Sequence, residues 1–374
     1  MIYFDSAATT FQKPPEVAAA MERALAVMSS PGRGGYPEAV MAAETAFVCR
    51  SELGELFGLG DPERVVFTMN ATHALNIAIK SLVSPGGRAV ISGYEHNAVT
   101  RPLAALGAET AVAAGPLFRP EAVAAAFERL ITPETQAVIC CHVSNVFGFI
   151  QPVETVAALC RSRGVPLIID ASQSAGVLEL DMDALGAAFI AMPGHKGLYG
   201  PQGTGVLLCG ENVPVHPLME GGTGSASLRQ EMPDFLPDRL EAGTHNMPGI
   251  AGLLAGVRYV RRRGTGEICR KEREMTLVLS EGLRQLPGLR VFAEPGLGNQ
   301  AGVLSVAAEG RDCETLAQAL AERGTAVRAG LHCAPLAHRT AGTLDTGTVR
   351  LSLSDFNTPE EVFQVLENIR RILA

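Results

Sequence analysis

Between Pro14 and Leu254 the chain alternates short runs of β-branched and apolar residues with stretches that have the spacing of amphipathic helices. The runs RVVFT, RAVIS, QAVICCHVSN, PLIIDAS and AFIAMP predict strands, and residues 72–82, 121–130 and 153–163 predict helices. This alternation is typical of an α/β fold with a largely parallel sheet covered by helices. GTGVLLC follows AFIAMP so soon that we expect it to return antiparallel.

The pattern changes beyond about residue 254. Helices are predicted over residues 266–286, 313–323 and 359–373, and strands at AGVLSVA, AVRAG and TVRLSLS. This order is typical of a smaller α+β unit with its own sheet. We therefore expect a large domain over residues 15–255 and a small C-terminal domain over residues 256–374, with an arm over residues 1–14 that packs with the small domain.

Composition argues against several classes of function. With a formal charge of -8, the chain lacks the excess of Lys and Arg that a nucleic-acid surface needs, and its basic run RYVRRRG is expected to be a solvated helix end. No apolar run reaches the ~20 residues that span a membrane, so we expect a soluble cytoplasmic protein. The eight cysteines show no paired CxxC spacing, so no metal site is predicted.

Polar residues follow five of the predicted strands. In an open α/β sheet, ligands bind outside the carboxyl ends of the strands, so these side chains are expected to line one crevice. They are Asn70, Ala71 and Thr72 after RVVFT; Glu95, His96 and Asn97 after RAVIS; Asn145; Asp170 and Gln173; and His195 and Lys196 after AFIAMP.

Lys196 is one of only four lysines among 31 basic residues, and it lies in the Gly- and Pro-rich stretch AMPGHKGLYGPQGTG. Since arginine occupies most positions where any cation serves, Lys196 is a candidate for chemistry that needs an amine, such as imine formation. Neighbouring Gly194 and Gly197 indicate a close approach of the backbone to a ligand. His195 is either a ligand contact or only a turn residue.

Three other crevice residues have both a functional and a structural interpretation. Thr72 begins a helix, where unpaired N–H groups suit a phosphate, but an ordinary N-cap explains it equally well. Asp170 follows a buried run, so its carboxylate needs a partner, either a protonated pyridine nitrogen or backbone N–H groups. His96 can stack on an aromatic ligand, exchange protons or serve as a structural histidine.

The crevice thus combines an anion pocket, a buried acid, a flat side chain and an amine. Pyridoxal 5′-phosphate (PLP) uses all four when it binds to proteins. The residues therefore predict a PLP site in which Lys196 carries the cofactor.

Eight motifs follow one another along nearly the whole chain: YFDSAATT, EHNAV, HVSNVFG, DASQSAG, GHKGLYGPQGTG, EAGTHN, RAGLHCAP and VRLSLSDFNT. In this order they resemble the class V aminotransferase family of fold-type I PLP enzymes, and within it the cysteine desulfurases and selenocysteine lyases. The resemblance implies the PLP-dependent transferase fold type I, in which a large domain has a mainly parallel seven-stranded sheet and a smaller C-terminal domain is α+β.

The resemblance also implies roles in cofactor binding. Lys196 forms the imine with PLP and later moves protons, Asp170 pairs with the pyridinium nitrogen, and His96 stacks over the ring and acts in acid–base steps. The remaining contacts are Gln173 to the phenolic oxygen, and Ala71, Thr72 and His195 around the phosphate. Thr244 reaches that phosphate from a neighbouring subunit, which implies a homodimer with shared active sites.

Asn145 and Arg350 look like the pair that receives the substrate carboxylate in this family. A guanidinium group suits that task because it presents a planar pair of donors, and Arg328 is the third predicted substrate contact. A surface ion pair is the alternative for any single arginine.

Cys333 in RAGLHCAP lies outside any helical or alternating pattern, so it is expected in a loop. In the family the cysteine of this motif receives sulfur, and the nearby His332 and Arg328 can favour its thiolate. A buried structural residue is the alternative, and it is the interpretation given to Cys140 and Cys141.

These roles predict a cysteine desulfurase that converts L-cysteine to L-alanine, leaves a persulfide on Cys333 and passes the sulfur to a persulfide-accepting protein. A selenocysteine lyase acting on L-selenocysteine fits the same residues. Other reactions of the fold, catalysed by a C–S lyase, an epimerase or an aminotransferase, need no nucleophilic cysteine. A non-enzymatic PLP-fold scaffold or regulatory protein is a further alternative, which the combination of Lys196, Asp170, His96 and Arg350 argues against.

Three positions depart from the commoner family pattern. Ala71 stands where many members have Thr, and Pro193 replaces the Ser or Thr that usually donates to the phosphate. Because proline has neither a hydroxyl nor an N–H group, that contact is lost. Tyr36 replaces a histidine, although Arg33 is in place. These departures bear on the choice of substrate more than on PLP binding.

Overall fold

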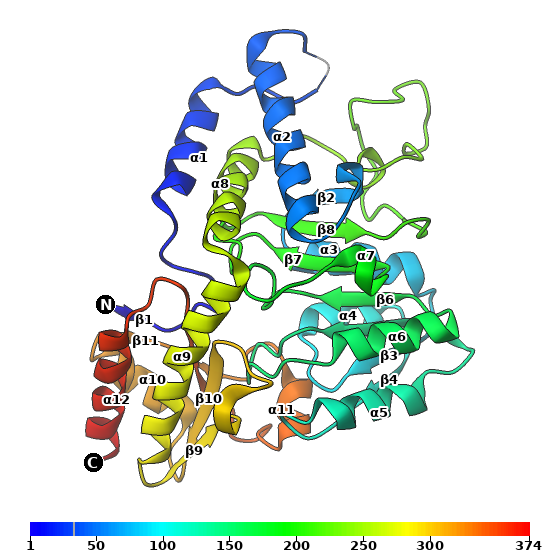
Figure 1. The fold of residues 1–374 in the computed structure, drawn as a ribbon. Coiled ribbons are helices and arrows are strands. Elements are labelled where there is room, and N and C mark those ends of the chain that lie inside the picture. Colours follow the sequence, from blue (N-terminus) through cyan, green and yellow to red (C-terminus); the bar gives the residue numbers. More distant parts are fainter. Residues whose placement is uncertain (33) are drawn as a thin grey trace.

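A seven-stranded sheet forms the centre of the computed structural model, which describes residues 1–32 and 34–374 (Figure 1). Arg33 lies outside the described residues. The strand order is β2-β8-β7-β6-β5-β3-β4, and β8 runs antiparallel to both of its neighbours while the other pairs are parallel. The strands are β2 (Val65–Thr68), β3 (Arg88–Ser92), β4 (Glu109–Ala113), β5 (Thr135–Cys141), β6 (Leu167–Asp170), β7 (Phe189–Pro193) and β8 (Gly205–Cys209).

Helices cover both faces of this sheet because successive side chains of each buried strand point to opposite sides. In β6, Ile169 packs with α2, α5, α6, α7 and α8 on one face, whereas Ile168 packs with α3 and α4 on the other. These helices are α2 (Pro37–Leu56), α3 (Ala71–Leu82), α4 (Asn97–Ala105), α5 (Pro120–Leu130), α6 (Val153–Arg163), α7 (Met182–Leu185) and α8 (Met247–Arg263). Helix α1 (Pro15–Val27) lies along α8, and the short 3-10 turns are η1 (Pro62–Arg64), η2 (Asp238–Leu240) and η3 (Pro295–Leu297).

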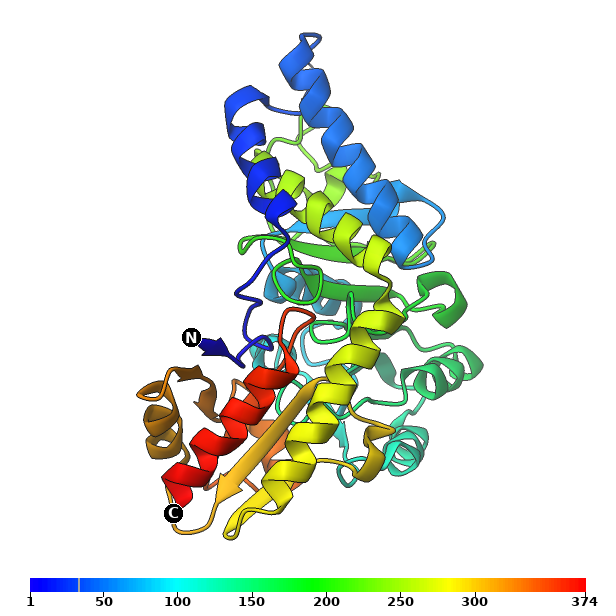
Figure 2. The same cartoon turned by 60° about the vertical axis from the view of Figure 1, so that its left-hand side comes forward.

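A second sheet, in the order β12-β13-β10-β9, is antiparallel throughout. Helices α9 and α12 lie side by side along it, as Figure 2 shows in yellow and red. The elements are α9 (Thr265–Arg284), β9 (Leu289–Phe292), β10 (Val303–Ala308), α10 (Cys313–Ala321), β12 (Arg328–Gly330), α11 (Pro335–Ala341), β13 (Thr348–Ser352) and α12 (Pro359–Leu373). The predicted α/β fold with a smaller α+β part is therefore confirmed.

The N-terminal arm joins this second part. Strand β1 (Ile2–Tyr3) pairs in parallel with β11 (Thr325–Ala326), and Ser352 donates its backbone N–H to the Phe4 carbonyl oxygen at 2.9 Å. The predicted boundary after residue 255 falls inside α8, which is separated from α9 by Gly264 alone. The division into an arm and two domains remains a prediction.

The sequence patterns did not predict strands β1, β4 and β9 or helices α1, α2, α4, α7 and α11, and of α8 they predicted only the end. Strand β4 reads ETAVA and lies mostly exposed at the sheet edge, so it lacks the run of buried β-branched residues that predicted its neighbours. The predicted end of a helix at RYVRRRG is correct, since Arg261 lies in the last turn of α8 and pairs with Glu52 and Glu55 on the surface.

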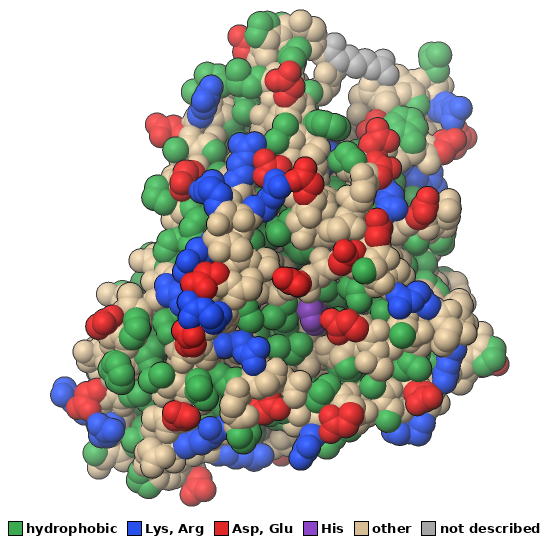
Figure 3. Space-filling model, viewed as in Figure 1, with side chains coloured by type: hydrophobic (Ala, Val, Ile, Leu, Met, Phe, Trp, Pro, Cys, Tyr) green, Lys and Arg blue, Asp and Glu red, His purple; other side chains and the backbone are tan. Residues whose placement is uncertain are grey.

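Acidic and basic side chains are interspersed on the face shown in Figure 3. None of the helices in the described part of the chain has both the length and the apolar character needed to cross a membrane. Within the same residues, no group of three or more His, Cys, Asp or Glu side chains could hold a metal ion.

We predict that Gly256→Ala destabilises the protein by about 1–3 kcal/mol, because overpacking at a close contact forces the backbone to shift. A Cβ atom at Gly256 in α8 would lie 2.2 Å from the carbonyl oxygen of Leu198. The matched control is Gly266→Ala in α9, where nothing lies within 4 Å of the added carbon. Urea unfolding of both variants measures the difference, and equal stabilities would contradict the prediction.

Candidate active site

The carboxyl ends of the parallel strands border one cavity, which contains eight of the predicted site residues. They are Ala71, Thr72, His96, Asn145, Asp170, Gln173, His195 and Lys196. The predicted convergence of five strand ends is therefore confirmed. Pro193 also lines the cavity, whereas Tyr36 lies before α2, half exposed, with its hydroxyl 2.6 Å from Ser29 Oγ.

Lys196 lies in the turn that links β7 to β8. Tyr199 donates its backbone N–H to the Lys196 carbonyl oxygen at 2.8 Å and closes the turn. Burial, together with the nearby positive charge of Arg350, lowers the pKa of the Lys196 amine to about 8. Near neutral pH the protonated form therefore still predominates, but far more of the Lys196 amine is neutral than in an ordinary lysine, and the neutral form is the one that can act as a nucleophile.

The glycines beside Lys196 make room for protein atoms. A Cβ atom at Gly194 would meet Thr204 Oγ1 at 2.2 Å, and one at Gly197 would meet the Ala175 carbonyl oxygen at 2.4 Å. For both glycines, therefore, the side on which a Cβ atom would lie faces protein atoms. Their role is to let the turn that carries Lys196 pack tightly against neighbouring segments.

Asp170 ends β6 and is buried. Its Oδ1 atom accepts a hydrogen bond from the Ser172 N–H at 2.9 Å, so the backbone interpretation holds for one of the two oxygens. The negative charge of Asp170 raises the pKa values of Lys196 and His96, although other effects lower both overall. The carboxylate is thus close enough to influence both groups in the cavity.

His96 is both a structural residue and part of the cavity wall. It is the N-cap of α4, where its Nδ1 atom accepts from the Ala98 N–H at 3.0 Å. Burial lowers the pKa of His96, so the ring is neutral at neutral pH. Because Nδ1 accepts a hydrogen bond, the proton of the neutral ring lies on Nε2.

The N-terminus of α3 borders the same cavity. Asn70, not Thr72, is its N-cap, since Asn70 Oδ1 accepts from the His73 N–H at 2.9 Å. Ala71 and Thr72 follow in the first turn, where backbone N–H groups have no partner within the helix. Among the described residues, the buried Nδ1 atom of His195 also has no partner. These groups suit an anion.

The predicted substrate residues lie at the junction with the smaller sheet. Arg350 is buried; its Nη1 atom donates to the Asn145 carbonyl oxygen at 3.1 Å, and its Nη2 atom lies 2.7 Å from Asp5 Oδ1. Arg328 is half exposed and reaches the other oxygen of Asp5 at 3.1 Å. Within the described ranges, the Nε atom of Arg350 is buried and has no hydrogen-bond partner.

Sequence reasoning predicted that the N-terminal arm packs with the small domain but gave it no role in the site, yet this segment holds several site residues. Gln173 Nε2 donates to the Ala7 carbonyl oxygen at 3.0 Å, while Thr10 Oγ1 and Lys13 Nζ donate to the His195 carbonyl oxygen at 3.0 and 2.9 Å. Burial lowers the pKa of Lys13 to about 8. The only available signal was the resemblance of YFDSAATT to a family motif, since these contacts have no local pattern.

Cys333 lies in an exposed loop next to the cavity, as predicted. Its carbonyl oxygen accepts from the Asn97 N–H at 2.8 Å, and that of His332 accepts from Asn145 Nδ2 at 2.8 Å. Both loop residues have left-handed backbone angles, with φ of 50° at His332 and 55° at Cys333. Two non-glycine residues adopt this conformation only where their surroundings impose it.

The structure gives Cys333 less electrostatic help than expected. Burial lowers the pKa of His332 to about 3, so its ring is neutral and cannot supply the positive charge that would favour a thiolate. The Nε2 atom of this ring lies 3.1 Å from the carbonyl oxygen of Thr348. By contrast, Cys140 and Cys141 are buried with raised thiol pKa values, which confirms their structural interpretation.

Thr244 lies outside this cavity. It is exposed and lines a separate hollow with Met69 and Met219. The segment that carries it is held by Glu241, whose buried carboxylate accepts two hydrogen bonds from Arg50 at 2.8 and 2.6 Å and a further one from His245. Within one subunit, Thr244 is therefore separated from the other predicted phosphate residues.

The profile of the family described as aminotransferase class-V matches residues 2–365. The chain belongs to the aminotransferase class-V family. A relative in Methanothermobacter thermautotrophicus, named a probable cysteine desulfurase, is 32% identical over 385 residues and matches 99% of this chain and 94% of its own length. A second probable cysteine desulfurase, from Mycolicibacterium paratuberculosis, is 32% identical over 389 residues; the match covers 100% of this chain and 55% of that relative.

The solved structures point to the same family. The apo structure of a cysteine desulfurase from Thermococcus onnurineus NA1 matches 100% of this class-V chain and 94% of its own, with a TM-score of 0.90 and 31% identity. The resemblance drawn from the eight motifs is therefore confirmed, and so is the fold type of PLP-dependent transferases.

We predict that Glu241→Gln lowers the free energy of unfolding by about 3–5 kcal/mol, because it leaves the buried Arg50 guanidinium without its counter-charge. The matched control is Glu274→Gln, which breaks an ion pair with Arg270 whose side chains are 55% and 61% exposed. Its effect is expected to stay below about 1 kcal/mol. Urea unfolding measures both, and a small loss in Glu241→Gln would contradict the prediction.

Proposed function

We propose that this class-V family member is a PLP-dependent cysteine desulfurase that converts L-cysteine to L-alanine. The observation that carries the proposal is the place of Cys333, an exposed cysteine whose loop is hydrogen-bonded to Asn97 and Asn145 beside the cavity that contains Lys196. The names of the relatives support it, since those proteins are cysteine desulfurases or probable ones.

PLP fits the residues that are present. The unpartnered Nδ1 atom of His195 and the first turn of α3, with Ala71 and Thr72, suit its phosphate. Asp170 is a buried carboxylate for the ring nitrogen, and Lys196 is an amine of lowered pKa that would hold the cofactor covalently. We assign stacking over the ring to His96 and the phenolic oxygen to Gln173. When bound, PLP withdraws electrons from the α-carbon of an amino acid.

Side chains of the protein would bind the substrate and move its protons. Arg350, with the free Nε atom of its guanidinium, and Asn145 would receive the substrate carboxylate, with Arg328 at the rim. Lys196 would take the proton from the substrate α-carbon, because its lowered pKa leaves far more of its amine neutral than in an ordinary lysine. Asp170 would keep the ring nitrogen protonated by its negative charge.

Sulfur transfer would take place at Cys333. Its thiolate attacks the sulfur of the substrate, an S–S bond forms, and the bond between that sulfur and the β-carbon breaks with its electron pair left on the carbon. A proton would then add to the β-carbon and another would return from Lys196 to the α-carbon, so the organic product is alanine and Cys333 holds a persulfide. A thiol of an acceptor protein would take the terminal sulfur in a redox-neutral exchange that leaves the Cys333 thiol; a reducing compartment such as the cytoplasm keeps such acceptor thiols free.

We further propose a homodimer in which Thr244 serves the phosphate site of a second copy. Thr244 is exposed and apart from the cavity of its own chain, and the surrounding Met69 and Met219 side chains are 54% and 46% exposed. Burial of these apolar side chains against a second chain would favour association. The hydrophobic cluster formed by Phe4 and residues from Met275 onwards supports the division into an arm, a large domain and a small domain.

We predict that Cys333→Ala reduces the rate of alanine formation from L-cysteine to the background, while PLP binding is unchanged. The variant removes the attacking sulfur and nothing that touches the predicted cofactor site. The control is Cys269→Ala, a half-buried cysteine of α9, which is expected to keep the full rate. Alanine production by PLP-loaded protein with a thiol reductant measures this. A full rate in Cys333→Ala would favour the lyase, epimerase or aminotransferase alternatives.

We predict that Lys196 of the cofactor-free protein becomes methylated by formaldehyde and borohydride as the pH rises through about 8, rather than through the ordinary lysine value of 10.5. The sign follows from the lowered pKa, since the amine is protonated and unreactive below it and neutral above it. Mass spectrometry of the peptide that contains Lys196 measures the reaction. Added PLP should block it, and a rise only near pH 10.5 would show that the amine is not perturbed.

A further inference from the structure

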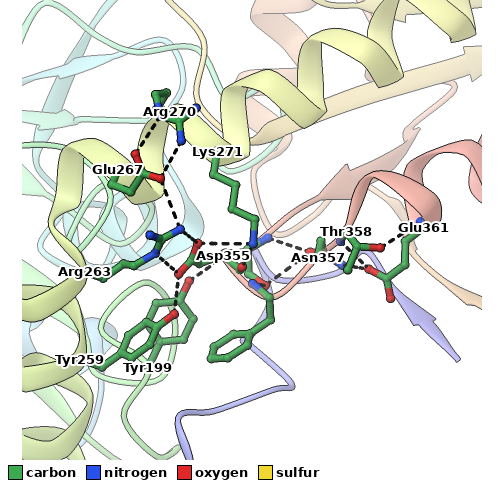
Figure 4. A network of polar contacts seen from close by, with 12 residues as sticks. Tyr199, Tyr259, Arg263, Glu267, Arg270, Lys271, Asp355, Asn357, Thr358 and Glu361 are labelled. Carbon is green, nitrogen blue, oxygen red and sulfur yellow. Dashed lines mark hydrogen bonds and ion pairs between the residues drawn. The ribbon is translucent and has the colours of Figure 1, made fainter.

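Asp355 is a buried carboxylate outside the cavity, and its role is not explained by the proposed chemistry. Its Oδ2 atom accepts hydrogen bonds from the Tyr259 hydroxyl at 2.5 Å and from Arg263 Nε at 3.0 Å, and its Oδ1 atom lies 3.6 Å from Lys271 Nζ (Figure 4). The side chain of Asp355 is 2% exposed. Burial raises the pKa of Asp355, but the hydrogen bonds from Arg263 and Tyr259 lower it by more than burial raises it. The pKa of Asp355 is therefore below its ordinary value, and the group remains an anion.

The backbone of Asp355 reaches the turn that carries Lys196. Its N–H group donates to the Tyr199 hydroxyl at 3.1 Å, and the Tyr199 N–H donates to the Lys196 carbonyl oxygen at 2.8 Å. The Tyr199 ring is fully buried and packs edge-on against Tyr259 and Phe356, with centroids 5.3 and 5.5 Å apart. We call Asp355, Tyr199, Tyr259, Arg263 and Lys271 the Asp355 hub.

The hub also fixes the segment that follows Arg350. Asp355 comes five positions after Arg350, just beyond β13. Asn357, two positions further, donates from Nδ2 to the Tyr3 carbonyl oxygen at 3.1 Å and so holds the N-terminal arm, which carries Asp5, the partner of Arg350. The carboxylate of Asp355 therefore binds α8 and α9, its backbone N–H binds Tyr199 beside the Lys196 turn, and the segment that it anchors runs between β13, which carries Arg350, and Asn357, which holds the arm.

We infer that Asp355 is a positioning residue that sets the distance between Lys196 and Arg350. This inference rests on the proposed function, in which an amino-acid substrate is held at two points, by the group at Lys196 and by its carboxylate at Arg350. Neither Asp355 nor Tyr199 touches the substrate. If Lys196 and Arg350 were displaced relative to each other by about 1 Å, the resulting misalignment of the substrate could lower kcat/KM by up to ~100-fold.

The test uses two variants of the PLP-loaded enzyme. Tyr199→Phe removes only the hydroxyl that accepts a hydrogen bond from the Asp355 N–H group. Asp355→Asn removes the negative charge that pairs with Arg263 and Lys271. Both are expected to raise the KM for L-cysteine ~10-fold or more, with a smaller fall in kcat, because substrate alignment is affected more than the reacting groups. Both should also shift the pH midpoint of the visible absorbance of the bound cofactor, which reports the surroundings of Lys196.

The matched control is Glu267→Gln. Glu267 lies at the exposed rim of the same charge network, where it pairs with Arg263 at 3.5 Å and Arg270 at 2.6 Å without reaching the Lys196 turn. It should leave the KM and the absorbance midpoint at wild-type values. Should Asp355→Asn fail to fold, Tyr199→Phe decides alone, since its ring packing is kept.

The outcomes separate the inference from the proposed function. A wild-type enzyme that releases no alanine from L-cysteine would overturn the proposed function. An active wild type with a Tyr199→Phe variant that only melts at a lower temperature, while KM and absorbance midpoint stay unchanged, would make the hub purely structural and overturn the inference.

Discussion

The pairing of parallel strands is the constraint on which the site depends. In the registers of β5, β6 and β7, Cys141 lies opposite Asp170, and Asp170 lies opposite Ala191. These strands therefore end at the same edge of the sheet, and the turns that follow them come together there. A slip of one residue between two strands would turn every side chain of one strand to the opposite face and would direct Asp170 away from the cavity.

Local patterns were sufficient to predict the cavity, because each contributor follows directly after a strand that the sequence marks clearly. Lys196 and Asp170 are of this kind. Helix details were less predictable: Thr72 was a plausible N-cap, but Asn70 two positions earlier occupies that place. Both residue types are good caps, so propensity alone could not decide between them. The glycines beside Lys196 are a similar case, since a glycine indicates a close approach without identifying the approaching atom.

Contacts between distant segments could not be predicted from the sequence by local rules. Nothing in the arm shows that Asp5 would meet Arg350 and Arg328, or that Lys13 would reach the carbonyl oxygen of His195. The predicted aid of His332 to Cys333 failed because burial is a property of the folded chain. Asp5 supplies a counter-charge that lowers the cost of keeping Arg350 out of water. The two arginines and Asp5 together carry one net positive charge, which matches the single carboxylate of an amino-acid substrate.

The pairing of the arm has a consequence for the order in which the protein can be completed. During synthesis Asp5 emerges first, but its partner Arg350 is added 345 residues later, and Ile2 likewise waits for Thr325. The large sheet has all its strands once Cys209 has emerged. An unfinished chain on the ribosome can therefore hold a sheet and a lysine-bearing turn, yet it has no assembled arginine site until translation is almost over.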